Sequence, residues 1–187
     1  MRRGLTMVEL LVSMAVFSLL AALLVSALVA VMRMSYRGTL RANLQGQATL
    51  AITRLVGDLQ RSSPAGVSMS SGAVAICPMD GLTGQGTAVW GSSLAIYSRD
   101  GRRLLRERWP PGPPDPSRQL APSFPIHLTP QELAAFASGT NGTEVVLARD
   151  VEEFRLSGAG ADLSIRLKLA RGPDTFELIR AVRLRQP

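Results

Sequence analysis

Residues Gly4-Leu5-Thr6-Met7-Val8-Glu9 stand directly before an apolar stretch from Leu10 to Met32 that contains no charged residue. At about 1.5 Å per residue, a helix over this stretch is about 34 Å long, enough to cross a hydrocarbon core of about 30 Å. Glu9 is unusual in this place, because an ionisable side chain near a membrane interior costs about 2–3 kcal/mol. The stretch therefore predicts a membrane-spanning helix with Glu9 as a functional residue.

The order of a short basic leader, Gly4, Thr6, Glu9 and a long apolar helix resembles the start of type IV pilins and type II secretion pseudopilins. The resemblance implies that a prepilin peptidase cleaves between Gly4 and Leu5 and then N-methylates Leu5. It also implies that Glu9 pairs with the amino terminus of a neighbouring subunit during assembly. Physical chemistry agrees, because an unpaired carboxylate and an unpaired ammonium are each costly in a low-dielectric environment.

A cleaved signal or a plain anchor fits the apolar stretch less well. A cleaved secretory signal has an apolar region of only about 7–15 residues, and Arg2-Arg3 lacks the surroundings of a twin-arginine signal. A plain single-pass anchor accounts for the length but leaves Gly4 and Glu9 without a role. We therefore expect a leader peptide at 1–4 and a transmembrane helix at 5–32.

Composition limits the function further. The chain has 187 residues and a formal net charge of +7, which leaves room for the anchor and one ordinary soluble domain. Cys77 is the only cysteine, so no intramolecular disulfide can form, and we expect Cys77 to be a small buried residue. His127 is the only histidine, so a histidine-cluster metal site or a histidine-based triad lacks its parts. We expect no enzymatic activity, no metal site and no cofactor.

After the apolar stretch, apolar residues recur at spacings of three and four, which predicts an amphipathic continuation of the helix over 33–62. This face consists of Leu40, Leu44, Ala48, Ala51, Ile52, Leu55, Val56 and Leu59. Ser63-Pro64-Ala65-Gly66 then ends the helix. Gly38, Gly46 and Gly57 interrupt it, and two interpretations stay open: close packing under a sheet, or a helix that loosens when the subunit leaves the membrane.

Residues 63–187 have a strand-like period and predict a β-rich globular domain. The expected strands are 73–77, 92–98, 103–109, 144–156 with a bend near Asp150, 163–170 and 176–184. Asp100-Gly101 between two alternating runs predicts a hairpin. Thr129, Pro130 and Glu132 predict the capped start of a short helix over 130–137, after a proline-rich loop at 110–125. The short connections favour antiparallel pairing as a meander.

These expectations define an α+β fold in which a long N-terminal helix, transmembrane and then amphipathic, packs on an antiparallel meander sheet, as in pilins. Residues 53–61, 148–156 and 181–185 resemble the larger minor subunits, the J-type pseudopilins and W-type pilins. This resemblance implies a structural subunit that helps initiate or cap a type IV pilus or a type II secretion pseudopilus. The implied partners are prepilin peptidase, other major and minor pilins or pseudopilins, membrane lipid and the inner-membrane assembly platform.

Flanking charge does not settle the orientation, because Arg2-Arg3 precede the apolar stretch and Arg33, Arg37 and Arg41 follow it. The resemblance implies a cytoplasmic N-terminus and a periplasmic C-terminal domain in a bacterial inner membrane, before transfer to the filament.

An arginine-rich hairpin supports an alternative function, a DNA-binding minor pilin of a competence pilus. Its residues are Arg99, Arg102, Arg103, Arg106, Arg108 and Trp109. Arginines would neutralise phosphates, and Trp109 could stack on a base. Against this, alternate residues of a strand face opposite sides, and Asp100 and Glu107 offset part of the charge. Contact with acidic surfaces of partner pilins and a solvated hairpin edge are the remaining interpretations of this hairpin.

Overall fold

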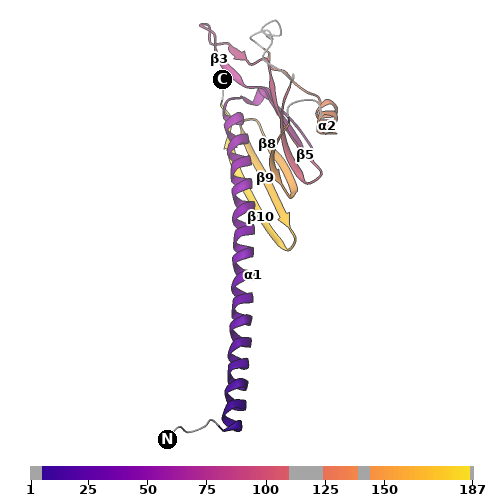
Figure 1. Ribbon diagram of the computed structural model, residues 1–187. Helices are drawn as coiled ribbons and strands as arrows, with labels where there is room; N and C mark the ends of the chain where they lie inside the picture. Colours follow the sequence, from indigo (N-terminus) through magenta and orange to yellow (C-terminus); the bar gives the residue numbers. More distant parts are fainter. Residues whose placement is uncertain (1–5, 110–123, 139–143, 186–187) are drawn as a thin grey trace. The chain divides into compact units, whose positions relative to one another are not determined.

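The computed structural model describes residues 6–109, 124–138 and 144–185. The chain divides into two compact units, Met1–Ala42 and Asn43–Pro187. Helix α1 (Met7–Gln60), labelled in Figure 1, contributes to both units. The strands and the second helix belong to the second unit. The fold is α+β, with a long apolar N-terminal helix and antiparallel sheets, as the sequence predicts.

Helix α1 has 54 residues and ends two residues before the predicted position 62. From Asn43 onward it buries one face, at the spacings of three and four that an amphipathic helix requires. The buried residues are Leu44, Ala48, Ala51, Ile52, Leu55 and Leu59. The remaining two residues of the predicted face, Leu40 and Val56, are half-buried. A short 3-10 turn, η1 (Pro64–Gly66), follows, so the predicted helix stop is confirmed.

The larger sheet has the strand order β1-β2-β5-β6-β7. Its strands are β1 (Val67–Ser70), β2 (Ala73–Ile76), β5 (Leu94–Asp100), β6 (Arg103–Trp109) and β7 (Val145–Arg149). Val74, Ile76 and Tyr97 face the buried side of α1, whereas Ala73 and Ala75 face a second apolar cluster that includes Leu133 of helix α2 (Pro130–Ser138). Both faces of β2 are therefore covered, which explains its uninterrupted apolar sequence.

The second sheet is a meander in the order β10-β9-β8. Its strands are β8 (Val151–Ala159), β9 (Asp162–Arg171) and β10 (Asp174–Arg183), and each pairs antiparallel with its neighbour in sequence. Leu163, Ile165, Leu167 and Leu169 alternate with more exposed residues along β9 and belong to the same core as α1. The period of two therefore places one face of this sheet in the core.

The expected single strand over 144–156 is wrong, because the chain breaks at Asp150 into β7 and β8, which belong to different sheets. Asp150 has a φ of 61°, which is uncommon for a residue with a side chain. Its carbonyl accepts a hydrogen bond from the Ala170 N–H, and the next N–H, of Val151, donates to the Arg102 carbonyl. Asp150 thus joins the two sheets, where the sequence predicts only a bend.

Two short strands, β3 (Met79–Leu82) and β4 (Ala88–Trp90), form a small separate sheet that the sequence pattern does not predict. They flank a glycine-rich connection, and their register shifts between Met79 and Gly81. Short strands with glycine and an irregular register carry little periodic signal.

The predicted hairpin and the predicted second helix are confirmed. The β5–β6 hairpin forms with Asp100 opposite Arg103 and a two-residue turn, in which Gly101 has a φ of 55°. Helix α2 begins at the predicted Pro130 and ends one residue later than expected. Most of the proline-rich loop lies outside the described residues.

Within the described part of the second unit, the α1 glycines are not closely packed under a sheet. A Cβ atom added at Gly46 or Gly57 would have no described heavy atom within 4 Å outside the neighbouring helix backbone. The packing interpretation is therefore wrong for Gly46 and Gly57, and for Gly38 both interpretations stay open. The loosening of the helix stays a prediction at all three glycines.

Candidate functional site

The first turn of α1 holds the Glu9 side chain in a defined position. The backbone N–H and the hydroxyl of Thr6 donate hydrogen bonds to Oε2 of Glu9, at 2.9 and 2.8 Å. The N–H of Glu9 donates to Oγ1 of Thr6 at 3.4 Å. This reciprocal arrangement is a capping box, which satisfies N–H groups that have no partner inside the helix.

Helix α2 begins with the same arrangement. The Thr129 N–H and hydroxyl both donate to Oε2 of Glu132 at 2.8 Å, and the Glu132 N–H donates to Oγ1 of Thr129 at 3.3 Å. Only the cap at Thr129 and Glu132 is predicted from sequence, although Thr6-Met7-Val8-Glu9 has the same T-x-x-E spacing. Thr6 is therefore a residue of the candidate site that our sequence-based prediction missed, and this spacing is the signal that could have found it.

The two oxygens of the Glu9 carboxylate have different surroundings. Oε2 accepts both bonds from Thr6, whereas no described residue donates to Oε1. The side chain is exposed, and no cation of the described chain forms an ion pair with it. Glu9 can thus cap its own helix and accept a further donor at the same time. Gly4 and Leu5, the predicted cleavage site, lie outside the described residues.

The helix that follows Glu9 is apolar and uncovered. Large apolar side chains from Met7 to Met34 are 41–83% exposed, with Phe17 at 75% and Leu24 at 72%. Among the described residues, α1 is the one helix long and apolar enough to cross a membrane, and none of its apolar window is buried inside the structure. Fully burying one such side chain is worth about 1.5–3 kcal/mol, so this surface requires an apolar environment from outside the chain.

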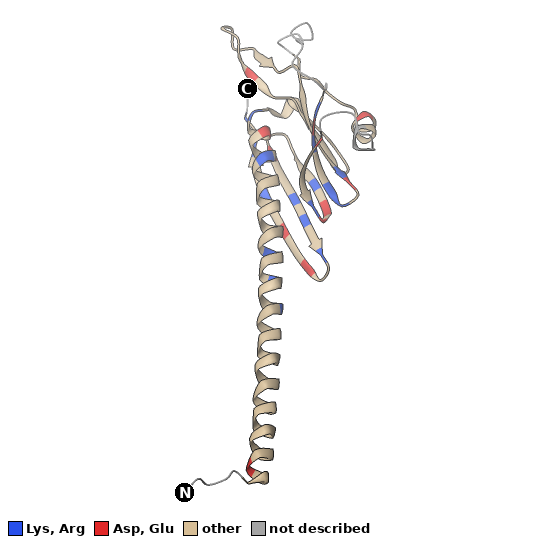
Figure 2. Cartoon of the chain, viewed as in Figure 1, with Lys and Arg blue, Asp and Glu red and all other residues tan. Residues whose placement is uncertain are grey.

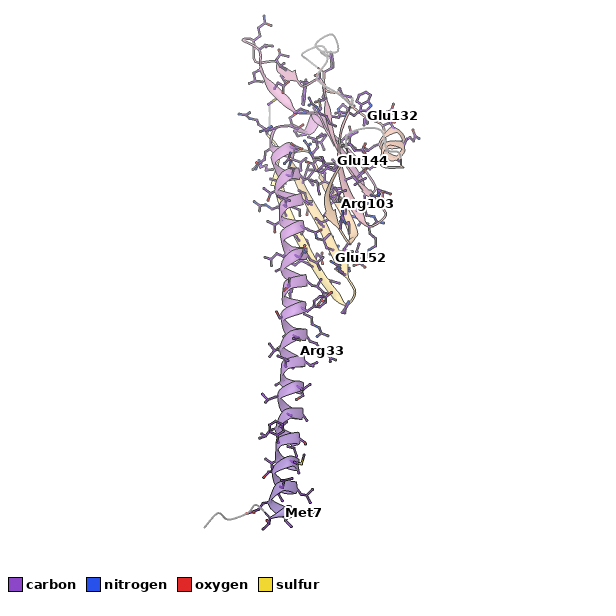
Figure 3. All side chains as sticks on the ribbon, viewed as in Figure 1. Met7, Arg33, Arg103, Glu132, Glu144 and Glu152 are labelled. Carbon is purple, nitrogen blue, oxygen red and sulfur yellow. The ribbon has the colours of Figure 1, made fainter. Side chains whose placement is uncertain are left out.

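The hairpin arginines contact different partners within the chain. Arg106 points toward α1, where its Nε and a terminal nitrogen lie 3.0 Å from Oδ2 of Asp58. Arg102, at the hairpin turn, donates to the Ala170 carbonyl and lies 3.7 Å from the Asp150 carboxylate. Arg103, labelled in Figure 3, pairs with Asp100.

Arg108 and Trp109, the last two residues of the predicted contact site, are also engaged. Nε of Arg108 donates to the Ser93 hydroxyl at 3.3 Å. Trp109 is half-buried against the second apolar cluster, which includes Leu133 of α2. Asp58, Arg106 and Arg108 line a cavity of about 220 Å³ next to the end of α1. Each of Arg102, Arg103 and Arg106 thus has an acidic partner within the chain, which leaves less of their charge for DNA phosphates. Contact with DNA or a partner stays a prediction.

Asp58, Tyr97 and Arg106 form a polar cluster between α1 and the larger sheet. The Tyr97 hydroxyl donates to Oδ2 of Asp58 at 2.5 Å, and Nε of Arg106 lies 3.2 Å from the same hydroxyl. Burial, together with the Asp58 carboxylate, raises the pKa of Tyr97. Burial alone would lower the pKa of Arg106, but the Asp58 charge and the hydrogen bonds to Tyr97 and Asp58 together outweigh it, and the pKa is raised. Asp58 and Arg106 thus neutralise each other between α1 and the sheet, and the position of the cluster indicates a structural role.

Cys77 is fully buried, as predicted, and burial raises the pKa of its thiol. Its Sγ lies 3.6 Å from the Gly91 carbonyl. A buried thiol with a raised pKa is a poor nucleophile. Within the described ranges, no group of three or more histidine, cysteine, aspartate or glutamate residues is placed to hold a metal ion.

Comparison with known families agrees with this geometry. Residues 1–25 match the family described as "Prokaryotic N-terminal methylation motif". The match covers the predicted cleavage site, Thr6, Glu9 and the first part of the apolar helix. A search of curated proteins finds no match.

The motif and the fold together support the class of type IV pilin-like and pseudopilin proteins. Proteins of this class are structural, are processed by prepilin peptidase and assemble with other pilins. The exposed apolar helix near the N-terminus is consistent with membrane anchoring.

Proposed function

We propose that this protein is a minor pilin or pseudopilin that helps initiate or cap a type IV pilus or a type II secretion pseudopilus. The observation that carries the proposal is the position of Glu9. Its carboxylate is fixed by Thr6 on the first turn of an exposed apolar helix, within the matched methylation motif.

The geometry suggests how Glu9 acts in assembly. Cleavage between Gly4 and Leu5 gives Leu5 a positively charged amino terminus, which is methylated in this class. Oε1 of Glu9, to which no described residue donates, accepts this ammonium from a neighbouring subunit, while Oε2 continues to cap the helix. Pairing satisfies both charges away from water and fixes the axial register between two helices.

A minor role and a periplasmic domain are parts of the same proposal. The three stretches that resemble minor subunits all contribute to one core, through Leu55 and Leu59, Val151 and Phe154, and Val182 and Leu184. These stretches therefore hold the end of α1 and the second sheet together. The N-terminus lies in the cytoplasm, and the domain folds in the periplasm before the subunit leaves the inner membrane.

The test separates the charge of Glu9 from its capping role. Glu9→Gln keeps the capping box, because glutamine serves at this position, but it removes the charge. We expect normal insertion and cleavage and at least a tenfold loss of incorporation into filaments, measured by quantitative immunoblotting of sheared filaments against the membrane fraction. Glu9→Ala should have the same effect.

Two variants serve as controls. Glu132→Gln makes the same chemical change in the second capping box and should leave incorporation unchanged. Thr6→Ala removes the cap but keeps the Glu9 charge, and it should reduce incorporation less than Glu9→Gln does. Normal incorporation of Glu9→Gln would contradict the proposed role.

A further inference from the structure

Arg33, Arg37 and Arg41 form a charged stripe on α1 directly after the apolar stretch. They are spaced by four residues, so they fall within about 80° of one another around the helix axis. All three are exposed, and the described residues offer none of them a side-chain hydrogen bond or an ion pair. Figure 3 shows Arg33 projecting away from the helix.

The helix itself supplies no counter-charge to this stripe. Between Glu9 and Asp58 the sequence contains four arginines and no acidic residue. Figure 2 shows the same pattern: α1 is uncharged from its first turn up to the arginines, where blue segments begin. An anion for the stripe must therefore come from outside the helix.

The position of the stripe fits the headgroup region of a bilayer. The apolar stretch before Arg33 spans about 34 Å, slightly more than a hydrocarbon core of about 30 Å. Side chains of a helix lean toward its N-terminus, so the Arg37 and Arg41 side chains extend back toward the membrane surface. Tyr36, which is 66% exposed, lies between Arg33 and Arg37 in sequence and is a residue type enriched at membrane interfaces.

We propose that Arg33, Arg37 and Arg41 bind the phosphates of anionic lipid headgroups and fix the depth of the unassembled subunit in the membrane. In the proposed orientation these three arginines lie on the periplasmic side of the membrane. Their charge therefore opposes the usual enrichment of lysine and arginine on the cytoplasmic side. The contacts must be released when α1 leaves the bilayer. The inference rests on membrane anchoring and not on the identity of the filament.

The test uses the purified full-length chain in lipid nanodiscs containing equal amounts of phosphatidylglycerol and phosphatidylcholine. Native mass spectrometry measures the ratio of the two lipids retained on the protein. We expect phosphatidylglycerol to be enriched on the unmodified chain. The variant Arg33→Gln/Arg37→Gln/Arg41→Gln should lower the enrichment at least fivefold, which corresponds to about 1 kcal/mol, the value for one arginine near an anionic surface.

Two further variants make the result specific. Arg155→Gln/Arg180→Gln/Arg183→Gln removes the same charge from exposed sites on the second sheet and should leave the enrichment unchanged. Replacing the three stripe arginines with lysine keeps the charge and should keep the phosphatidylglycerol enrichment. If the glutamine variant inserts poorly into nanodiscs, the lysine variant still tests the proposal.

Equal retention of the two lipids by the unmodified chain would overturn the proposal. If the glutamine variant then lost copurifying pilins from membranes, the stripe would bind an acidic protein surface instead. The proposed filament role can fail independently of the lipid proposal. An uncleaved N-terminus would contradict the filament role but would leave the preference for phosphatidylglycerol intact.

Discussion

The two parts of helix α1 use similar residues for opposite purposes. In the second part, residues 43–60, the leucines on the packed face are buried, with Leu55 1% exposed, whereas Leu50 on the opposite face is 63% exposed. In the first part, residues 7–42, every leucine before Leu40 is exposed, with Leu24 72% exposed. The domain therefore explains the sequence of the second part, whereas the first part is explained only by a bilayer or by other subunits. Matched substitutions in the two parts test this division.

Leu55→Ala should lower the free energy of unfolding of the domain by about 3 kcal/mol, because it leaves a cavity between α1 and the sheets. Leu24→Ala makes the same change in the first part and should not alter domain unfolding. Denaturant unfolding of the full-length chain in detergent, followed by near-ultraviolet circular dichroism, measures both. Equal destabilisation by the two variants would show that the first part also packs within the chain.

Asp58→Ala should destabilise the domain by about 2 kcal/mol, because it leaves the half-buried Arg106 and the Tyr97 hydroxyl without their shared acceptor. Asp162→Ala is the matched control. Asp162 and Arg183 are 3.8 Å apart, with side chains 82% and 76% exposed. Removing this ion pair should lower the free energy of unfolding by less than about 0.5 kcal/mol. The same unfolding experiment compares them, and an effect of Asp58→Ala no larger than the control would show that the cluster does not stabilise the domain.

Gly46→Ala should stabilise the domain by about 0.5–1 kcal/mol, because alanine favours a helix and its Cβ would contact nothing. Gly38→Ala, in the first part, should leave domain unfolding unchanged. A clear destabilisation by Gly46→Ala would reveal a close contact that the structure does not contain. If either glycine serves to loosen the helix during transfer, its alanine variant should enter filaments more slowly at unchanged domain stability.

The smallest effect concerns the pH response of the packed domain. Burial and then the nearby Glu144 carboxylate raise the pKa of the Glu107 carboxyl. The folded state therefore binds this proton more tightly than the unfolded state, whose carboxyl has a pKa of about 4.3. The stability contributed by the proton is complete below that value and is lost as the pH rises through the raised pKa.

Glu107→Gln should accordingly flatten the fall in the thermal midpoint as the pH rises above the unfolded-state pKa of about 4.3. Glu177→Gln, at an exposed position, should keep it. If the thermal midpoint of Glu107→Gln falls with pH as steeply as that of the unmodified chain, the raised pKa of Glu107 is contradicted.

Periodic signals predict much of this fold from sequence. The long helix, the β5–β6 hairpin, the α2 cap and the last two strands follow from spacing and turn residues alone. Sequence could not predict the break at Asp150, because its positive φ depends on hydrogen bonds to residues distant in the chain. The β3–β4 pair is too short and too rich in glycine to have a period.

The candidate site was predictable in identity but not in geometry. Glu9 stands out as a carboxylate beside an apolar stretch, and Thr6 could have been found from its spacing. The pairing of Arg106 with Asp58 could not, because 48 residues separate them and only the packing of α1 on the sheet joins them. The hairpin arginines therefore resemble one basic group in sequence but have separate partners in the structure.

The most direct test of this chain as a pilin-class subunit is the intact mass of the protein purified from its native membrane. We expect the mass of a chain that begins at Leu5 and carries one methyl group. The mass of an uncut chain from Met1, in cells with an active prepilin peptidase, would contradict this assignment.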